Sequence, residues 1–340
     1  MRGCSTMEQA LFWRRAGMRA GLALGAAMGG GLSGPAEAGQ GGTPAVMDPM
    51  MAALVRFVRR LPGRHEDIPR LRTEYEIAMR LTGLRPLAGI EMKRLAIPGL
   101  PAAREYRPAG GVRGTLLFFH GGGFIMGNPA TRDGLCGRLA ATGLRVISAG
   151  YRLAPEHPFP AAHDDAAAAL AWVHAARERE AWPGPLIVGG DSAGANLAAS
   201  LSLDGGVAAQ ALIYPVIDMV QEPHRYPSIA AFGEGFLLTA EGMEACAKAL
   251  IPPGQDRAEP RLSPIRADLS RAAPALVVTA GFDPLRDQGR AFAAALRSAG
   301  RQAELLEEPS LVHGFADFAG VVPAARRAVD RVAAAVGALV

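Results

Sequence analysis

The apolar positions of the chain fall into short runs and longer amphipathic stretches. The short runs predict strands at 89–99, 102–110, 115–120, 145–151, 185–190, 209–215, 275–281 and 303–309. Most of them are separated by stretches with apolar residues at helical spacing, such as 163–180 and 289–300. Strands that alternate with helices indicate a parallel sheet covered on both faces. We therefore expect an α/β fold with a mostly parallel eight-stranded sheet and helices on both faces.

Two parts of the chain depart from this alternation. Residues 47–61 and 70–84 have helical spacing and precede the first predicted strand, so they predict two amphipathic helices. Residues 218–262 interrupt the alternation with helical and irregular sequence. We expect these parts, about 47–84 and 218–262, to form a helical cap over the sheet within one domain of residues 47–340.

Residues 1–46 lie outside this pattern. They contain paired arginines, a weakly apolar stretch and an "AEA" tripeptide ending at Ala38, which together resemble an export signal of the twin-arginine kind. A disordered extension, or a translation start at Met7 or Met47, would explain the same residues. The location stays open between the cytoplasm and, for a cleaved signal, the periplasm or the exterior. The apolar stretch is shorter than the about 20 residues of a membrane-spanning helix, and no other stretch is long enough, so no transmembrane anchor is expected.

Composition narrows the possible partners. Of the 340 residues, 49% are hydrophobic and 20% charged, as in a globular protein. The formal net charge is +4, the basic residues are scattered and aromatic residues make up 6%, so we expect no nucleic-acid partner. Cys4, Cys136 and Cys246 form neither a metal-binding pattern nor a disulfide framework, and Cys136, among apolar residues at helical spacing, is expected to be a buried structural thiol.

Three consecutive glycines follow the predicted strand at 115–120, in the sequence "HGGG" from His120 to Gly123. Glycine loses much conformational entropy on folding and packs no side chain, so such a run indicates a sharp bend or a close approach of the backbone to a ligand. A phosphate-binding loop is excluded, because the Gly-x-x-x-x-Gly-Lys-Ser/Thr spacing is absent. The remaining interpretations are a tight turn, or backbone N–H groups that take part in the chemistry.

A second glycine-rich site, "GDSAG" from Gly190 to Gly194, fits Gly-x-Ser-x-Gly. It lies between an apolar predicted strand and a helical run, the context in which a serine nucleophile is presented on a sharp turn. Small residues must flank such a serine, and the positive end of the helix dipole points at the reacting centre. The run fails as a dinucleotide-binding fingerprint, because Asp191 would stand where glycine is required. Ser192 is therefore a candidate nucleophile.

A serine nucleophile needs a base and a third group that orients the base. His313 follows the last predicted strand, which is the place of the histidine in triads that run in the order serine, acid, histidine. The acid should follow the preceding strand, where Asp283 and Asp287 are both available. Asp283 comes first and precedes a proline suited to the start of a helix.

These motifs resemble those of the hormone-sensitive-lipase-like esterases of the α/β-hydrolase fold, also called bacterial family IV. The resemblance rests on "HGGGF", "YRLAPEHPFPAA", "GDSAGAN", "SPI", "DPLRD" and "HGF", in the family's order and approximate spacing, and extends from about Met47 to the C-terminus. It implies Ser192 as the nucleophile of a catalytic domain, with Asp283 and His313 as its partners.

The resemblance also gives the triglycine a role. It implies that backbone N–H groups of the "HGGG" run form the oxyanion hole, which stabilises the charge of a tetrahedral intermediate. We expect the N–H of Gly122, with that of Gly121 or Gly123, to donate alongside the N–H of Ala193. Side chains at these glycines would block the approach of an ester.

The implied function is a carboxylesterase that cleaves short-chain acyl esters of small molecules under a helical cap, with no cofactor and no metal. The sequence departs from the family at two places: Ala195 stands where glycine is usual, and Gly281 replaces an acidic residue often found two positions before the catalytic aspartate. The resemblance does not fix the oligomeric state, and a homodimer is one outcome.

Two alternatives remain at this point. The same machinery would serve an acyl hydrolase for an amide, a lactone or an acetylated natural product. A binding protein on the same fold is the more distant alternative, since the plant gibberellin receptors resemble this family but lack the catalytic histidine. The presence of Ser192, Asp283 and His313 together argues against a binding protein.

Overall fold

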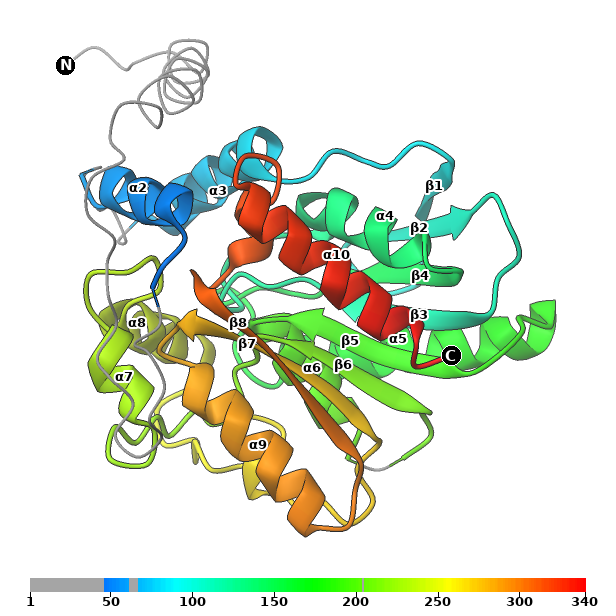
Figure 1. The fold of residues 1–340 in the computed structure, drawn as a ribbon. Coiled ribbons are helices and arrows are strands. Elements are labelled where there is room, and N and C mark those ends of the chain that lie inside the picture. The colour runs from blue at the N-terminus through cyan, green and yellow to red at the C-terminus, as the bar shows by residue number, and fades with distance from the viewer. Residues whose placement is uncertain (1–45, 61–66, 204) are drawn as a thin grey trace.

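The computed structural model describes residues 46–60, 67–203 and 205–340 (Figure 1). Residues 1–45, which include the stretch that resembles an export signal, lie outside the described residues. Among the described residues, no helix is both long and apolar enough to cross a membrane.

The centre of the fold is an eight-stranded sheet in the order β1-β2-β4-β3-β5-β6-β7-β8. Its strands are β1 (Ile90–Leu95), β2 (Ala103–Pro108), β3 (Gly114–Phe119), β4 (Leu144–Ala149), β5 (Leu186–Asp191), β6 (Ala209–Ile213), β7 (Ala275–Phe282) and β8 (Ala303–Val312). All neighbours from β4 to β8 are parallel, whereas β2 is antiparallel to both β1 and β4. The mostly parallel eight-stranded sheet predicted from the apolar runs is confirmed.

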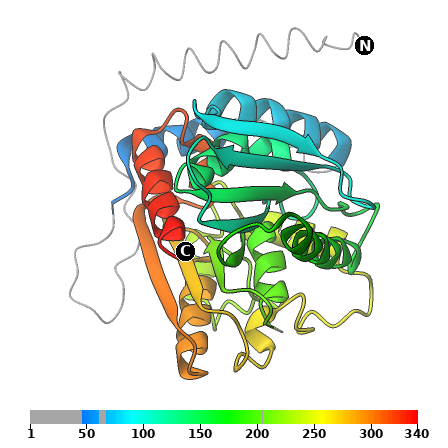
Figure 2. The ribbon, with the colours of Figure 1, turned by 90° about the vertical axis from the view of Figure 1, so that its right-hand side faces the viewer.

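Helices cover both faces of this sheet (Figures 1 and 2). They are α4 (Asp133–Ala140), α5 (Ala161–Glu180), α6 (Ala193–Leu201), α9 (Arg286–Ser298) and α10 (Pro323–Gly337). Successive strand residues point to opposite faces. Leu117 of β3 accordingly packs in one core with α5, α6 and α9, whereas its neighbour Leu116 packs in a second core with α4 and α10. Cys136 is fully buried in the second core, as expected for a structural thiol.

Two helices precede the sheet, α2 (Pro49–Val58) and α3 (Ile68–Thr82). Each begins where an aspartate caps it. Oδ1 of Asp48 accepts the N–H groups of Met50 and Met51, both at 3.0 Å, and Oδ1 of Asp67 accepts the N–H of Arg70 at 3.1 Å. In Figure 1, α2 lies on the side of the molecule at which β7 and β8 end.

The insertion between β6 and β7 contains α7 (Pro227–Phe232) and α8 (Ala240–Leu250), which lie on the same side as α2 (Figure 1). Buried polar contacts fix its path. The carboxylate of Asp218, which is fully buried, accepts hydrogen bonds from Tyr226 Oη at 2.8 Å and from Arg266 Nε at 3.0 Å. Ser228 of α7 donates its N–H to Asp287 Oδ2 of α9 at 2.8 Å. These contacts join the start of the insertion to the segment that follows it and attach α7 to α9.

The pairing of β7 with β8 contains an irregularity between Ala280 and Phe282, which places Gly281 against the neighbouring strand. A Cβ atom on Gly281 would lie 2.0 Å from the carbonyl oxygen of Pro309. This contact excludes every side chain, so the acidic residue usual in the family has no room here.

We expect Gly281→Ala to lower the free energy of unfolding by about 1–3 kcal/mol, because the added methyl group overpacks this contact. Gly110→Ala is the matched control, since a Cβ at Gly110 would meet nothing within 4 Å. Urea unfolding followed by circular dichroism measures both variants. Equal stability of the two variants would contradict the tight contact at Gly281.

Candidate active site

Ser192 lies in the turn between β5 and α6, with φ 53° and ψ −116°. The positions two before and two after Ser192 leave no room for a side chain. A Cβ on Gly190 would lie 2.4 Å from the carbonyl carbon of Gly194, and a Cβ on Gly194 would lie 2.1 Å from the carbonyl oxygen of Phe119. The turn therefore has the strained strand-to-helix geometry that the Gly-x-Ser-x-Gly pattern predicts.

The structure brings the three predicted triad residues together. Ser192 Oγ lies 3.0 Å from His313 Nε2, and His313 Nδ1 lies 2.9 Å from Asp283 Oδ2. The other carboxylate oxygen of Asp283 accepts the N–H of Leu285 at 2.7 Å, which fixes the orientation of the group. Asp283 follows β7 and His313 follows β8, so the carboxyl ends of three parallel strands supply the set.

Asp287, the second candidate acid, has other partners. Its Oδ2 accepts the N–H of Ser228 at 2.8 Å, and its Oδ1 accepts a hydrogen bond from Arg286 Nε at 2.9 Å. It lies in the first turn of α9 and connects that helix to α7. Of the two carboxylates, only Asp283 contacts His313 in the described structure.

The charge balance around His313 favours its protonated form. Burial of the ring, the largest single influence, opposes the imidazolium, whereas the charge and the hydrogen bond of Asp283 favour it. Asp317 and Asp191 act in the same direction as Asp283. Together they raise the pKa of His313 above its usual 6.5.

The N–H groups of the candidate oxyanion hole differ in whether they already have an acceptor. The N–H of Gly121 donates a hydrogen bond to Asp191 Oδ1 at 2.9 Å, which removes Gly121 from the set of available donors. In the described part of the chain, no group accepts a hydrogen bond from the N–H of Gly122, Gly123 or Ala193. Of the alternatives Gly121 and Gly123, this contact favours Gly123 as the second glycine donor, because the N–H of Gly121 is used to hold the loop in place.

At Gly122 and Gly123, the other two glycines of the run, the backbone requires glycine. Gly122 has φ 126° and a Cβ there would lie 2.2 Å from the carbonyl oxygen of Met126. Gly123 has φ 62° and a Cβ there would lie 2.5 Å from the sulfur of Cys246. Positive φ is readily adopted by glycine alone, so the bend and the close contacts both explain the run.

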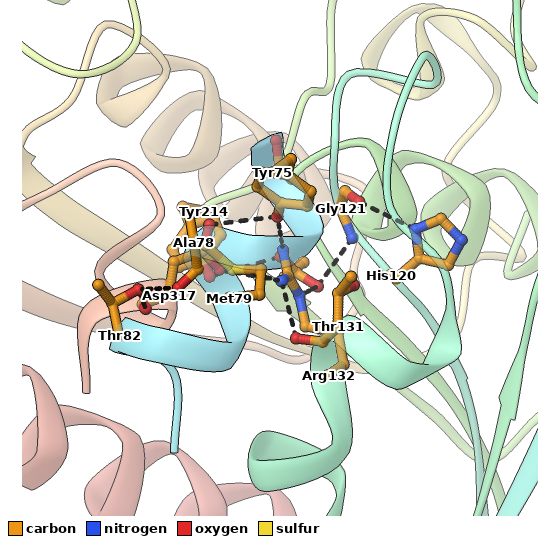
Figure 3. A network of polar contacts seen from close by, with 12 residues as sticks. Tyr75, Ala78, Met79, Thr82, His120, Gly121, Thr131, Arg132, Tyr214 and Asp317 are labelled. Atoms are coloured by element: carbon orange, nitrogen blue, oxygen red, sulfur yellow. Dashed lines mark hydrogen bonds and ion pairs between the residues drawn. The ribbon is translucent and has the colours of Figure 1, made fainter. Parts of the chain in front are cut away.

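His120 supports this loop from behind. Its Nδ1–H donates to the carbonyl oxygen of Gly121 at 2.9 Å (Figure 3). Its ring stacks on Tyr151 with centroids 4.4 Å apart. Tyr151 in turn donates its hydroxyl to the carbonyl oxygen of His120 at 2.8 Å. Burial lowers the pKa of His120 to about 4, so the ring is neutral near pH 7 and supports the loop as an uncharged side chain.

A buried polar network lies beside the triad and was missed by the sequence reasoning (Figure 3). Arg132 donates to both carboxylate oxygens of Asp191, from Nε to Oδ1 at 2.8 Å and from Nη2 to Oδ2 at 2.7 Å. The same guanidinium contacts the hydroxyl of Tyr75 at 2.8 Å and Oδ1 of Asp317 at 3.0 Å. Arginine is rarely fully buried, so nothing in the sequence around Arg132 indicated this position.

Ser192 and His313 open into a cavity of about 290 Å³. Most of its wall is apolar, and both parts of the chain that were expected to form a cap contribute to it. These residues include Val58, Met219, Leu237, Leu238, Met243 and Cys246.

Burial raises the pKa of the Cys246 thiol to about 11, so the thiol stays uncharged near pH 7. In the described part of the chain, no cluster of three or more His, Cys, Asp or Glu residues could hold a metal ion.

Comparisons with known proteins agree with this geometry. A family model described as the α/β hydrolase fold matches residues 116–317. The chain is 45% identical over 251 residues to the carboxylic ester hydrolase LipN of Mycobacterium tuberculosis, a match that covers 68% of this chain and 65%, just under two thirds, of LipN. It is 38% identical over 277 residues to the carboxylesterase NlhH of the same organism, covering 77% of this chain and 82% of NlhH. A hyperthermophilic esterase from the archaeon Pyrobaculum calidifontis superposes with a TM-score of 0.78 at 34% identity, covering 86% of this chain and 98% of the esterase.

The contrast between the two carboxylates gives a direct test. We expect Asp283→Asn to reduce ester turnover by roughly 10⁴-fold, because the imidazole loses its orienting acceptor and takes the wrong tautomer. Asp287→Asn should reduce turnover by less than about tenfold, since Asp287 contacts α7 and not His313. Steady-state kinetics on nitrophenyl butyrate, with circular dichroism to confirm folding, compares them. The reverse order would move the acid to Asp287.

The raised pKa of His313 predicts the pH dependence. The imidazole accepts the serine proton only when neutral, so kcat/KM should fall as the pH drops through the His313 pKa. Because that pKa is raised, the midpoint of the acidic limb should lie above 6.5. A pH series of kcat/KM with nitrophenyl butyrate measures it, and a midpoint below 6.5 would show that burial dominates over the carboxylates.

Proposed function

The chain belongs to the hormone-sensitive-lipase-like carboxylesterases of the α/β-hydrolase fold, and we propose that it hydrolyses short-chain acyl esters of small molecules with Ser192 as the nucleophile. The observation that carries this proposal is the unbroken hydrogen-bonded sequence from Ser192 through His313 to Asp283 at the floor of an apolar cavity. No cofactor is needed for the reaction, because all the proton transfers have a partner among these residues.

In the proposed mechanism, Ser192 Oγ attacks the acyl carbon of the ester while His313 Nε2 accepts its proton. Asp283 holds the ring by Nδ1–H and stabilises the imidazolium that forms. His313 then gives the proton to the leaving alcohol, and an acyl group remains on Ser192. Water, deprotonated by His313, attacks this acyl-enzyme and forms a second tetrahedral intermediate. When it collapses, the bond to Ser192 Oγ breaks, His313 returns the proton to Oγ, and the acid leaves.

The tetrahedral intermediates of both steps carry a negative oxygen. We assign its stabilisation to the N–H groups of Gly122, Gly123 and Ala193, which have no other acceptor in the described part of the chain. Such preorganised donors act without reorganising during the reaction, and removal of one typically raises the barrier by about 3 kcal/mol, or ~10²-fold in rate. The proposed hole therefore accounts for a large share of the rate enhancement.

The size of the cavity supports short acyl chains. Its volume of about 290 Å³ is just below the ~300–1,000 Å³ usual for small-molecule sites. Leu237 and Met243 of the insertion and Val58 of α2 close its wall, as a cap formed by about 47–84 and 218–262 would do. A long acyl chain has to displace these residues, so rates should decrease well before palmitate.

The alternative functions differ from an esterase either in the substrate that is hydrolysed or in the class of protein. An amide, a lactone or an acetylated natural product would use the same triad, and only a substrate panel separates them from a simple ester. A binding protein is disfavoured by the 3.0 Å contact between Ser192 and His313, which a binding role does not require. The homodimer considered from the sequence stays a prediction.

We expect the purified protein to hydrolyse nitrophenyl acetate and butyrate, with activity unchanged by a metal chelator and abolished by a serine-directed phosphonate. Ser192→Ala should lose about 10⁴-fold or more in turnover, because the nucleophile acts with its partners as a unit. Ser270→Ala, at an exposed serine outside the cavity, should keep full activity.

A series of nitrophenyl esters from acetate to palmitate measures the chain-length preference with the same proteins. Turnover in Ser192→Ala above about a tenth of the wild-type value would overturn the assignment of the nucleophile. Rapid hydrolysis of the palmitate ester or of emulsified long-chain triglyceride would overturn the short-chain preference.

A further inference from the structure

The guanidinium of Arg132 is the centre of the buried network in Figure 3. The side chain of Arg132 is only 4% exposed, and that of Asp191 1%. Arg132 lies at the end of η1 (Pro129–Arg132), and its partners come from other parts of the fold: Asp191 from the end of β5, Tyr75 from α3, and Asp317 from η3 (Phe315–Phe318). One side chain thus contacts three separate segments.

Each of these contacts leads to a group next to the proposed chemistry. Asp191 immediately precedes Ser192, and its Oδ1, which accepts from Arg132, also accepts the N–H of Gly121 at 2.9 Å. Gly121 immediately precedes Gly122 of the proposed oxyanion hole. The carboxylate of Asp191 therefore sets the separation between the nucleophile turn and the loop that carries the oxyanion donors.

The other side of the guanidinium faces the histidine loop and the N-terminal helices. Asp317 lies in η3, the turn that directly follows His313 and Gly314. Its Oδ2 accepts a hydrogen bond from the hydroxyl of Tyr75 at 3.2 Å, and its backbone carbonyl accepts the hydroxyl of Thr82 at 2.7 Å. The position of the His313 loop is thus linked through Asp317 to α3.

We propose that Arg132 is a positioning residue for the esterase reaction. It holds three segments in a fixed relative position: the turn at Ser192, the loop of Gly121 to Gly123 and the loop that carries His313. This inference rests on the proposed function of the triad. The planar fork of arginine suits the role, because it fixes the two oxygens of Asp191 in direction as well as in distance, which a lysine ammonium does not. The network faces the catalytic cavity, and Tyr75, Arg132, Asp191 and Asp317 all line it.

A purely structural role for the Arg132–Asp191 ion pair predicts a different outcome. Removal of such a pair lowers stability but leaves the kinetics of the folded enzyme unchanged. Arg331 and Glu308 form a two-pronged arginine–carboxylate pair outside the cavity, with Arg331 Nε 2.9 Å from Glu308 Oε1. Glu308 is buried, but the Arg331 side chain is 52% exposed. Arg331→Met is therefore a control for the loss of an arginine–carboxylate pair away from the cavity.

The test compares Arg132→Lys, Arg132→Met and Arg331→Met with the wild type on nitrophenyl butyrate. We expect the Arg132 variants to lose roughly 10-fold to 10²-fold in kcat, as misplacement of reacting groups by about 1 Å does, with KM changed by less than about threefold. The affinity for an alkylboronic acid, which forms a tetrahedral adduct on the serine, should fall by the same factor as kcat/KM. Arg331→Met should keep kcat within about threefold, whatever its melting temperature.

Circular dichroism establishes that each variant is folded at the assay temperature. A folded Arg132→Lys or Arg132→Met enzyme with wild-type kcat, or with a defect confined to KM and no change in boronate affinity, would overturn the positioning role. If both Arg132 variants fail to fold while Arg331→Met folds, Arg132 is a stability residue and the proposal is equally overturned. Failure of the wild type itself to hydrolyse the ester would instead refute the proposed function.

Discussion

The turn at Ser192 is the constraint on which the rest of the site depends. A non-glycine residue at φ 53° and ψ −116° is unfavourable by about 1–3 kcal/mol and persists only when its surroundings enforce it. Here the N–H of Ser192 donates to the carbonyl oxygen of Ile213 at 2.9 Å, and Gly190 and Gly194 leave no space for the turn to relax. The strain directs the hydroxyl away from the sheet and toward His313.

The surroundings of this turn are unusually rich in buried charge. Asp283, Asp191 and Asp317 all favour the imidazolium of His313, while burial of the ring opposes it. Arg132 offsets part of the negative charge and, at the same time, joins the nucleophile turn to the segments that carry the histidine and the oxyanion donors. The same few side chains thus supply both the electrostatics and the positioning, and the burial of Arg132, Asp191 and Asp283 weakens the screening of their charges by water.

Much of this arrangement could be predicted from the sequence, because it depends on residues that are close together along the chain. The apolar runs predict the strands, and "GDSAG" between a strand and a helix predicts the turn at Ser192. The contacts between distant segments were not predictable. The sequence left Gly121 and Gly123 as alternative donors, and only the folded chain shows that the N–H of Gly121 binds Asp191, which lies far along the chain. Arg132 stands in a polar loop, where an arginine is normally solvated, and only the folded chain places it between Asp191 and Asp317.

The central claim is that acyl transfer passes through a covalent intermediate on Ser192. Acid quenching of the enzyme during turnover of nitrophenyl butyrate, followed by mass spectrometry of the proteolysed chain, tests it most directly. We predict a butyryl group on the peptide that contains Ser192, at the residue itself, and none on that peptide from Ser192→Ala. Steady turnover with no acylated peptide at any time, or an acyl group on a different residue, would contradict the account.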